Sequence, residues 1–215
     1  IHTNEELYIN GKHLEQYKHF AYEPADYYLE ALKRDDGDSR CNTAMGNIRL
    51  KEGRFEEAIA YYDKAIARLT LRNDNPYDVE ALYHKGIALR YLGRLDEAYD
   101  CLYRSIWSHD YMAAGYYALA GIDCVRGDFD AAVKKLDLCL EAGTMNLEAM
   151  KLKAEITNDA ALFEKISALD PLFDSLPDKH EYYIDRAIEY MNAGMNGKAI
   201  AILKKANADQ PMVNY

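Results

Sequence analysis

Apolar residues recur at steps of three and four along most of this chain, which is the period of helices that bury one face. The 215 residues include only five prolines and twelve glycines, too few for a fold of short strands and frequent turns. The longest weakly polar run, 112–122, is far shorter than the ~18 residues that a membrane-spanning helix needs. The pattern therefore predicts an all-α protein without a transmembrane segment.

A repeat is superimposed on this helical period. In each of four copies, a small residue is followed seven positions later by glycine and twelve positions later by alanine. Two antiparallel helices approach closely when each has a small residue at their crossing, and the glycine between them can end the first helix in a left-handed conformation. Each copy is therefore expected to be a helix pair, and the large residue four positions after its alanine should fill the gap between neighbouring pairs. The copies are Gly46, Gly53, Ala58 and Tyr62; Gly86, Gly93, Ala98 and Leu102; Ala120, Gly127, Ala132 and Leu136; and Ala187, Gly194, Ala199 and Leu203.

This spacing resembles the tetratricopeptide repeat, in which a small residue and a turn glycine precede an alanine, an aromatic residue and a closing proline, a position that Pro211 would occupy. Gly127 follows Gly93 by 34 residues, the period of that family. The resemblance implies a right-handed superhelix of about six antiparallel helix pairs, forming a single array over residues 1–215. The expected units span approximately 4–36, 39–70, 79–110, 113–144, 147–171, which is shortened, and 180–211.

Two of these units are degenerate. The first keeps Leu7, Gly11, Tyr28 and Ala31, and its Pro24 is expected in the connecting turn or in the first turn of the second helix. The fifth unit lacks about seven residues of the 34-residue period, including the turn glycine.

A narrower resemblance concerns the residues 65–70 and 93–104. They are similar to the repeat segment of large bacterial proteins in which an N-terminal β-rich domain, often linked with carbohydrate metabolism, precedes such an array. The chain begins at Ile1 without methionine, so we expect a fragment of a longer protein. An accessory role beside a sugar-handling domain is the alternative function that this resemblance implies.

The net charge and the cysteine content limit the classes of partner and the cellular compartment that we expect. The 26 basic and 36 acidic residues give a net charge of −10, which repels a phosphate backbone and an anionic membrane surface. We therefore expect neither nucleic acid nor membrane as a partner. The four cysteines form no C-x-x-C pair and suit a reducing compartment, so a cytoplasmic location is expected. They are Cys41, Cys101, Cys124 and Cys139.

The sequence contains no catalytic or cofactor motif at a working spacing. Glycine-rich phosphate loops and the nucleophile elbow are absent. His180 and Glu181 begin like a zinc-protease helix, but Ile184 stands where the second histidine is required. We therefore expect no enzyme activity, no cofactor and no metal.

A binding site is expected on the concave wall, which the first helices of stacked pairs form. One subclass of the family binds the C-terminal carboxylate of a partner peptide with a set of Lys, Asn and Arg side chains. Of that set, only Asn47 stands at its expected place here, so the resemblance does not imply this kind of binding. Basic and aromatic residues gather in the middle of the projected wall, whereas Glu148, Glu155, Glu181 and Asp185 make its C-terminal part acidic. The candidate groove residues are Arg40, Asn47, Tyr83, His84, Arg90, Tyr91 and Tyr117.

These features predict a non-catalytic interaction module. Its groove would receive a protein or peptide partner, or another domain of the same chain, with an acidic portion near Arg40 and Arg90 and a basic portion toward Glu181. A scaffold role, or a homodimer formed through the ends of the array, is a further alternative.

Overall fold

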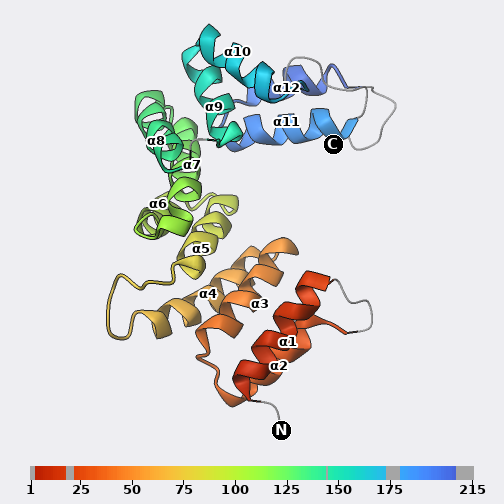
Figure 1. Cartoon of the computed structure of the whole chain (residues 1–215), viewed down its shortest axis with the longest axis vertical. Helices are drawn as coiled ribbons and strands as arrows, with labels where there is room; N and C mark the ends of the chain where they lie inside the picture. Colours follow the sequence, from red (N-terminus) through yellow and green to blue (C-terminus); the bar gives the residue numbers. More distant parts are fainter. Residues whose placement is uncertain (1–2, 18–21, 144, 173–179, 207–215) are drawn as a thin grey trace. The chain divides into compact units, whose positions relative to one another are not determined.

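The computed structural model describes residues 3–17, 22–143, 145–172 and 180–206, so Pro211 lies outside the described residues. Helices follow one another as antiparallel pairs, and no strand occurs within these ranges, which confirms the predicted all-α fold of helix pairs (Figure 1). The helices are α1 (Asn4–Tyr17), α2 (Pro24–Arg34), α3 (Ser39–Lys51), α4 (Phe55–Leu69), α5 (Glu80–Tyr91), α6 (Leu95–Ser105), α7 (His109–Arg126), α8 (Phe129–Ala142), α9 (Leu147–Thr157), α10 (Ala160–Leu169), α11 (His180–Asn192) and α12 (Asn196–Leu203).

The chain divides into two compact units, Ile1–Met112 and Ala113–Tyr215. In the first unit each helix from α1 to α6 packs against the next, and α3 also contacts α5. In the second unit α9 packs against α8 and α10, and α11 packs against α12. The helix α7 begins at His109, before the boundary, so its first turn belongs to the first unit.

The turn glycines do what their spacing predicts. Gly53, Gly93, Gly127 and Gly194 have φ values of 74°, 75°, 79° and 69°, the left-handed region that side chains with a Cβ resist. At Gly53 two backbone bonds close the helix end, from Gly53 N to Leu50 O (3.0 Å) and from the next residue's N to Arg49 O (2.9 Å), and equivalent bonds occur at the other three glycines. In the shortened fifth pair, Asn158 takes the left-handed conformation instead, with φ 53°.

A substitution at one of these turns measures the cost of the backbone conformation alone. A Cβ at Gly127 would meet no atom within 4 Å. We therefore expect Gly127→Ala to lower the free energy of unfolding by about 1 kcal/mol, entirely through left-handed strain. Urea denaturation followed by circular dichroism tests this value, and an unchanged midpoint would contradict it.

The small residues of the repeat face large rings or branched chains of the same pair. A Cβ at Gly46 would lie 2.4 Å from Tyr62 Cε1, and one at Gly86 would lie 2.6 Å from Leu102 Cγ. These large residues therefore lie against the glycine of their own pair, and Leu136 also shares a buried cluster with Ala149 of the next pair, as the spacing predicts. Tyr62 also reaches the next pair, because it shares a buried cluster with Ala81.

The same packing explains the degenerate first pair. A Cβ at Gly11 would lie 2.4 Å from the Tyr28 ring, and Ala31 is fully buried beside it. Pro24 is the first residue of α2, where a proline loses no helical hydrogen bond, as predicted.

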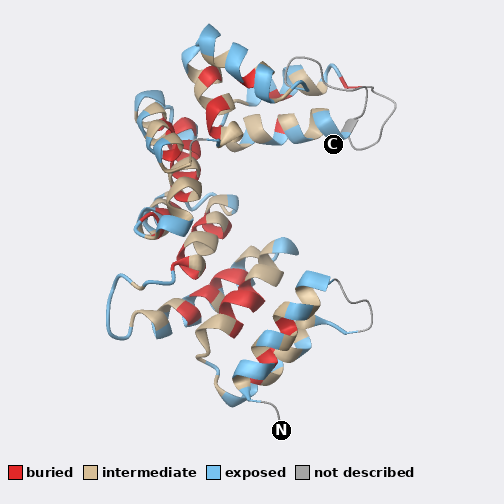
Figure 2. Ribbon diagram, viewed as in Figure 1, coloured by how far each residue is buried: buried red, intermediate tan, exposed pale blue. Residues whose placement is uncertain are grey.

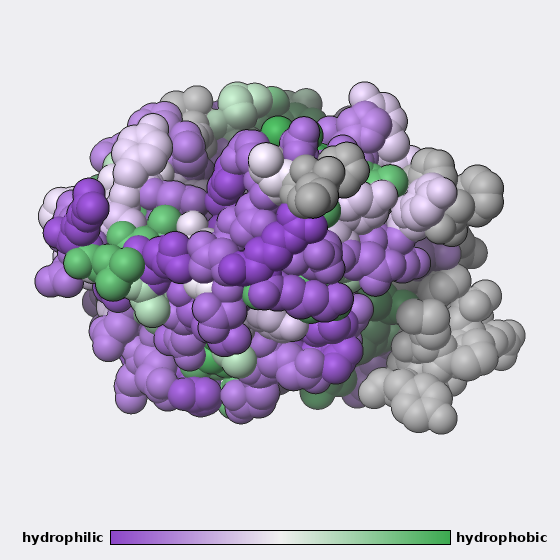
Figure 3. Space-filling view, turned by 90° about the horizontal axis from the view of Figure 1, so that it is seen from below, coloured by the Kyte–Doolittle hydropathy of each residue, from purple (hydrophilic) through white to green (hydrophobic). Residues whose placement is uncertain are grey.

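Buried residues gather on the facing sides of the paired helices, and the outward sides are exposed (Figure 2). The face of the molecule drawn in Figure 3 is mostly hydrophilic, with small separate hydrophobic areas. Among the described residues, no helix combines the length and the apolar content that crossing a membrane requires.

Candidate functional site

In the first unit, the predicted groove residue Arg40 lies at the start of α3 and reaches across to α1. Its Nη1 atom is 2.6 Å from Glu5 Oε2, and its guanidinium lies 4.8 Å from the centre of the Tyr8 ring. The charge of Arg40 is therefore already compensated by a carboxylate that the sequence projection did not include.

Asn47 links three helices of the first unit. Its amide nitrogen donates a 2.8 Å hydrogen bond to Glu80 Oε1 on α5, and its amide oxygen accepts a 2.8 Å bond from the Tyr62 hydroxyl on α4. The amide thus holds α3, α4 and α5 together, and a ligand would have to compete with Glu80 for its N–H groups.

Tyr83 and His84 on α5 form an aromatic cluster with Tyr111, which the sequence projection missed. The ring centres of Tyr83 and Tyr111 are 5.0 Å apart, and that of His84 lies 5.2 Å from Tyr83. Burial lowers the pKa of His84, although Glu80 opposes the shift, so the imidazole is neutral at pH 7. Tyr111 stands in the first turn of α7, two residues before position 113, where the fourth unit was expected to begin.

Arg90 and Tyr91 lie at the C-terminal end of α5. Burial raises the pKa of Tyr83, and the positive charge of Arg90 acts against that rise, which places Arg90 in the electrostatic surroundings of the cluster. The Tyr91 ring instead stacks on the ring of Phe55 on α4, with 4.9 Å between the ring centres and 7° between the ring planes. The structure therefore brings the rings of Tyr83 and His84 together, whereas the ring of Tyr91 lies against another helix.

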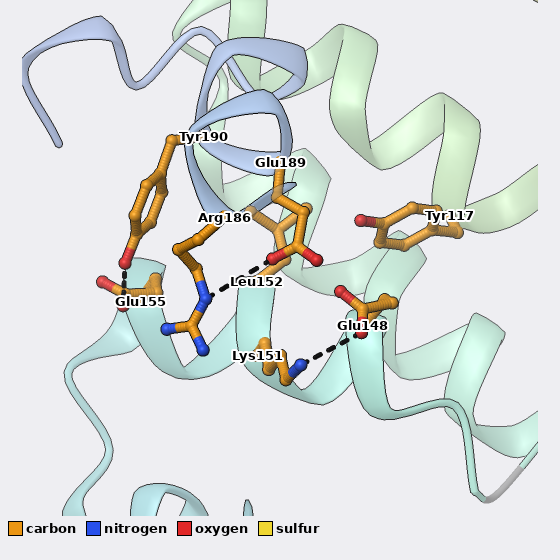
Figure 4. A pocket seen from close by; sticks show the side chains of 8 residues that line it. All are labelled: Tyr117, Glu148, Lys151, Leu152, Glu155, Arg186, Glu189 and Tyr190. Carbon is orange, nitrogen blue, oxygen red and sulfur yellow. Dashed lines mark hydrogen bonds and ion pairs between the residues drawn. The ribbon is translucent and has the colours of Figure 1, made fainter. Parts of the chain in front are cut away.

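In the second unit, the predicted residue Tyr117 lines a pocket between first helices of three pairs (Figure 4). Tyr117 comes from α7, and the others come from α9 and α11. We call it the α9–α11 pocket. Its lining residues are Tyr117, Glu148, Lys151, Leu152, Glu155, Arg186, Glu189 and Tyr190.

Ion pairs and hydrogen bonds organise the charged side chains of this pocket. Lys151 Nζ lies 3.1 Å from Glu148 Oε1 and 3.2 Å from Asp170 Oδ2. Arg186 Nε lies 3.8 Å from Glu189 Oε2. On the other side, Glu155 accepts a 2.7 Å hydrogen bond from the hydroxyl of Tyr190 and pairs with Lys198 of α12.

Two carboxyl groups of the pocket, those of Glu148 and Glu189, point toward one another from α9 and α11 (Figure 4). Burial raises the pKa of Glu189 to about 7, and the hydrogen bond and negative charge of Glu148 add to the rise, while Lys151 and Arg186 act against it. The pair therefore retains a proton at a higher pH than a free glutamate does.

Arg186, Glu189 and Tyr190 were missed by the sequence analysis, although a signal existed for Glu189. The residue two positions after the small one is Ile48, Ala88 or Ile122 in the other three copies, and Glu189 takes this place in the sixth pair. An ionisable residue at a position that normally packs between helices marks a polar site. The sequence projection chose Glu181 and Asp185 instead, which are both exposed.

The possible metal ligands and the thiols of the described residues have structural surroundings. Among these residues, no group of three or more His, Cys, Asp or Glu side chains is arranged to hold a metal ion. All four cysteines are free, with Cys41, Cys124 and Cys139 buried. In the acidic 35–38 stretch, Asp38 caps the N-terminus of α3 by accepting a 3.0 Å bond from Cys41 N. Asp35 stabilises the turn by accepting a 3.1 Å bond from Gly37 N.

Several known proteins share this arrangement of helix pairs. The chain is similar to MamA, with 17% identity, coverage of 89% of this chain and 96% of the other, and a TM-score of 0.59. It is similar to YrrB, described as a TPR protein with an unusual peptide-binding site, with 18% identity, 88% and 96% coverage, and a TM-score of 0.56. PilW, described as a widely conserved type IV pilus biogenesis factor, is 18% identical over 83% of this chain and 80% of its own, with a TM-score of 0.63.

Comparisons of the sequence identify the family of the chain. The protein MJ0572 of Methanocaldococcus jannaschii is 38% identical over 77 residues, which are 36% of this chain and 78% of that protein. The sequence profile of the tetratricopeptide repeat matches residues 39–106, which include α3 to α6. With the four left-handed turn glycines and the small-to-large packing of the pairs, these matches show that the chain belongs to the tetratricopeptide repeat family.

Proposed function

We propose that this chain is a non-catalytic interaction module that holds a segment of a partner protein, or of another domain of its own chain, against the first helices of its pairs. One observation carries the proposal: the side chains that converge on the α9–α11 pocket all come from first helices, namely α7, α9 and α11. Tetratricopeptide repeat proteins generally serve as interaction modules, and pockets between such helices present a partner with pre-arranged polar and aromatic groups.

The compartment that we propose for this module is a reducing one, such as the cytoplasm. The four thiols are free, and three of them are buried in the helix-pair core, where they pack as small apolar side chains.

Site-specific crosslinking in the native host tests the proposed function. The photo-crosslinking amino acid p-benzoylphenylalanine replaces Tyr117 or Tyr83, both on first helices, or Tyr103, which is 52% exposed on the second helix α6. We expect one protein to crosslink from position 117 or 83 and not from position 103. Crosslinks formed only from position 103 would place the interaction on the second helices and refute the proposal.

The resemblance to carbohydrate-associated proteins supports a narrower second candidate, in which Tyr91 stacks on a sugar. Tyr91 is 59% exposed while one face of its ring rests on Phe55, so the ring is held in place on a largely open residue. Titration with a series of neutral oligosaccharides should then give binding that Tyr91→Ala abolishes. Binding that is absent, or that survives this substitution, would remove the candidate.

A further inference from the structure

The α9–α11 pocket combines apolar walls with charged groups. Leu152 and the rings of Tyr117 and Tyr190 supply the apolar surface, and the carboxyl groups of Glu148 and Glu189 meet within the hollow (Figure 4). Pockets of this composition hold the apolar part of a ligand by contact and fix its orientation through the few polar groups.

The charges of the pocket do not balance when every acid is ionised. Lys151 is divided between two carboxylates, those of Glu148 and Asp170, and Lys198 is engaged with Glu155. Arg186 lies beside Glu189 at 3.8 Å, a longer separation than the other pairs have. These side chains therefore amount to four carboxylates and three cations, which leaves one negative charge in excess, and two of the four carboxyl groups meet at the pair of Glu148 and Glu189.

We propose that the α9–α11 pocket receives one basic side chain, arginine or lysine, of the bound partner segment, with its charged head between Glu148 and Glu189 and its alkyl stem against Leu152 and the two tyrosine rings. This inference rests on the proposed interaction function and names the chemistry of the partner at one position. A single positive charge is what the pocket lacks, so the ligand completes the electrostatic balance.

The protonation of the free pocket agrees with this assignment. The carboxyl pair holds a proton where no cation lies between its members, because burial and the negative charge of Glu148 raise the pKa of Glu189 to about 7. The groups that face Glu189 are Glu148, Lys151 and Glu155 of α9, Arg186 and Tyr190 of α11 and Tyr117 of α7, with Asp170 and Lys198 behind Lys151 and Glu155. A bound basic side chain would replace the proton, so binding should release up to one proton near neutral pH.

Other ligand classes fit the pocket less well. An anionic side chain would add to the uncompensated negative charge, and a neutral side chain could not displace the proton. The charge of the ligand is therefore the property to test. N-acetylarginine amide serves as the basic ligand, and N-acetylcitrulline amide is its control because it has nearly the same shape without the charge.

The experiment titrates the full chain at pH 7 with each of these two compounds and follows backbone amide resonances by NMR. We expect resonances of α9 and α11 to shift with N-acetylarginine amide, which should bind about tenfold more tightly than the citrulline compound. The carboxyl carbon of Glu189 should titrate at a lower pH when the arginine compound is present. Equal binding of the two compounds, or an unmoved titration of Glu189, would overturn the proposal.

Variants make the assignment specific to the carboxyl pair. Glu189→Gln keeps the shape of the side chain and should weaken binding of N-acetylarginine amide about tenfold, as should Glu148→Gln. Glu164→Gln removes an exposed carboxylate from α10 of the same unit and should leave binding unchanged. Full binding by both Glu189→Gln and Glu148→Gln, with native circular dichroism, would place the arginine elsewhere.

The result of the arginine titration can be distinguished from the result of the crosslinking test of the proposed function. If arginine binds in the pocket but no protein crosslinks from position 117 or 83, the interaction function fails and the pocket chemistry stands. If a partner crosslinks at these positions but arginine and citrulline bind alike, the function stands and the basic subsite is refuted.

Discussion

Gly46→Ala is expected to lower the free energy of unfolding by about 2 kcal/mol. The sign is opposite to the ordinary effect of this substitution within a helix, where alanine is favoured over glycine by about 0.5–1 kcal/mol. A Cβ at position 46 would lie 2.4 Å from Tyr62 Cε1 and 2.7 Å from Cδ1. The ring has no room to retreat, because it is fully buried and its hydroxyl is bonded to Asn47. Steric overlap therefore outweighs helix propensity.

A matched control separates the two effects. Gly197, in the first turn of α12, is exposed, and a Cβ there would meet no atom within 4 Å. Gly197→Ala should raise the free energy of unfolding by about 0.5 kcal/mol through helix propensity alone. Urea denaturation of both variants, followed by circular dichroism, gives the comparison. A gain of stability in both would show that the contact between Gly46 and Tyr62 is looser than the structure has it.

Coupling between the two positions provides a second check on the contact. The copies that carry alanine in place of this glycine, at Ala120 and Ala187, have leucine rather than tyrosine sixteen positions later. In a double-mutant cycle, Gly46→Ala combined with Tyr62→Leu should therefore cost less than the sum of the single changes. Additive losses would show that the overlap is relieved in another way.

Glu189→Gln is expected to raise the free energy of unfolding at pH 8 by about 1–2 kcal/mol and to leave it nearly unchanged at pH 4. Folding raises the pKa of Glu189 from its ordinary 4.5 to about 7, so the folded chain binds the proton more tightly than the unfolded chain. The stability that this group contributes is complete below pH 4.5 and is lost as the pH rises through 7. Without screening, a shift of this size corresponds to about 3 kcal/mol at 1.36 kcal/mol per pH unit. Solvent screens the Glu189 side chain, which is 35% exposed, so the expected effect is smaller.

Glutamine tests this linkage because it cannot ionise, yet its amide can donate to Glu148 as the protonated carboxyl does. Unfolding free energies measured at intervals from pH 4 to pH 8 should therefore fall less steeply for Glu189→Gln than for the natural chain. The exposed Glu164→Gln should follow the natural chain throughout. Parallel curves for all three proteins would mean that Glu189 titrates in the folded state as it does in the unfolded one.

Local features of the sequence were sufficient to predict the helix pairs. A glycine that ends one helix and the alanine that begins the packing of the next lie within one short stretch, so their spacing can be read without knowledge of distant contacts. The left-handed conformations of Gly53, Gly93, Gly127 and Gly194 follow from this spacing. Gly11, in a degenerate pair, keeps the same close approach to an aromatic ring as Gly46.

The charges and partners of the candidate sites were decided only by the tertiary structure. Glu5 neutralises Arg40 across 35 positions, and Tyr190 bonds Glu155 across as many, so neither contact has a signature in local spacing. The pocket depends on Glu189, whose place two positions after a small residue identifies it only once the sixth pair is aligned with the others. Its raised pKa depends on a carboxylate from a different helix and on burial between the two. Periodicity determines which residues form each helix, whereas the balance of charge at a site depends on which helices meet there.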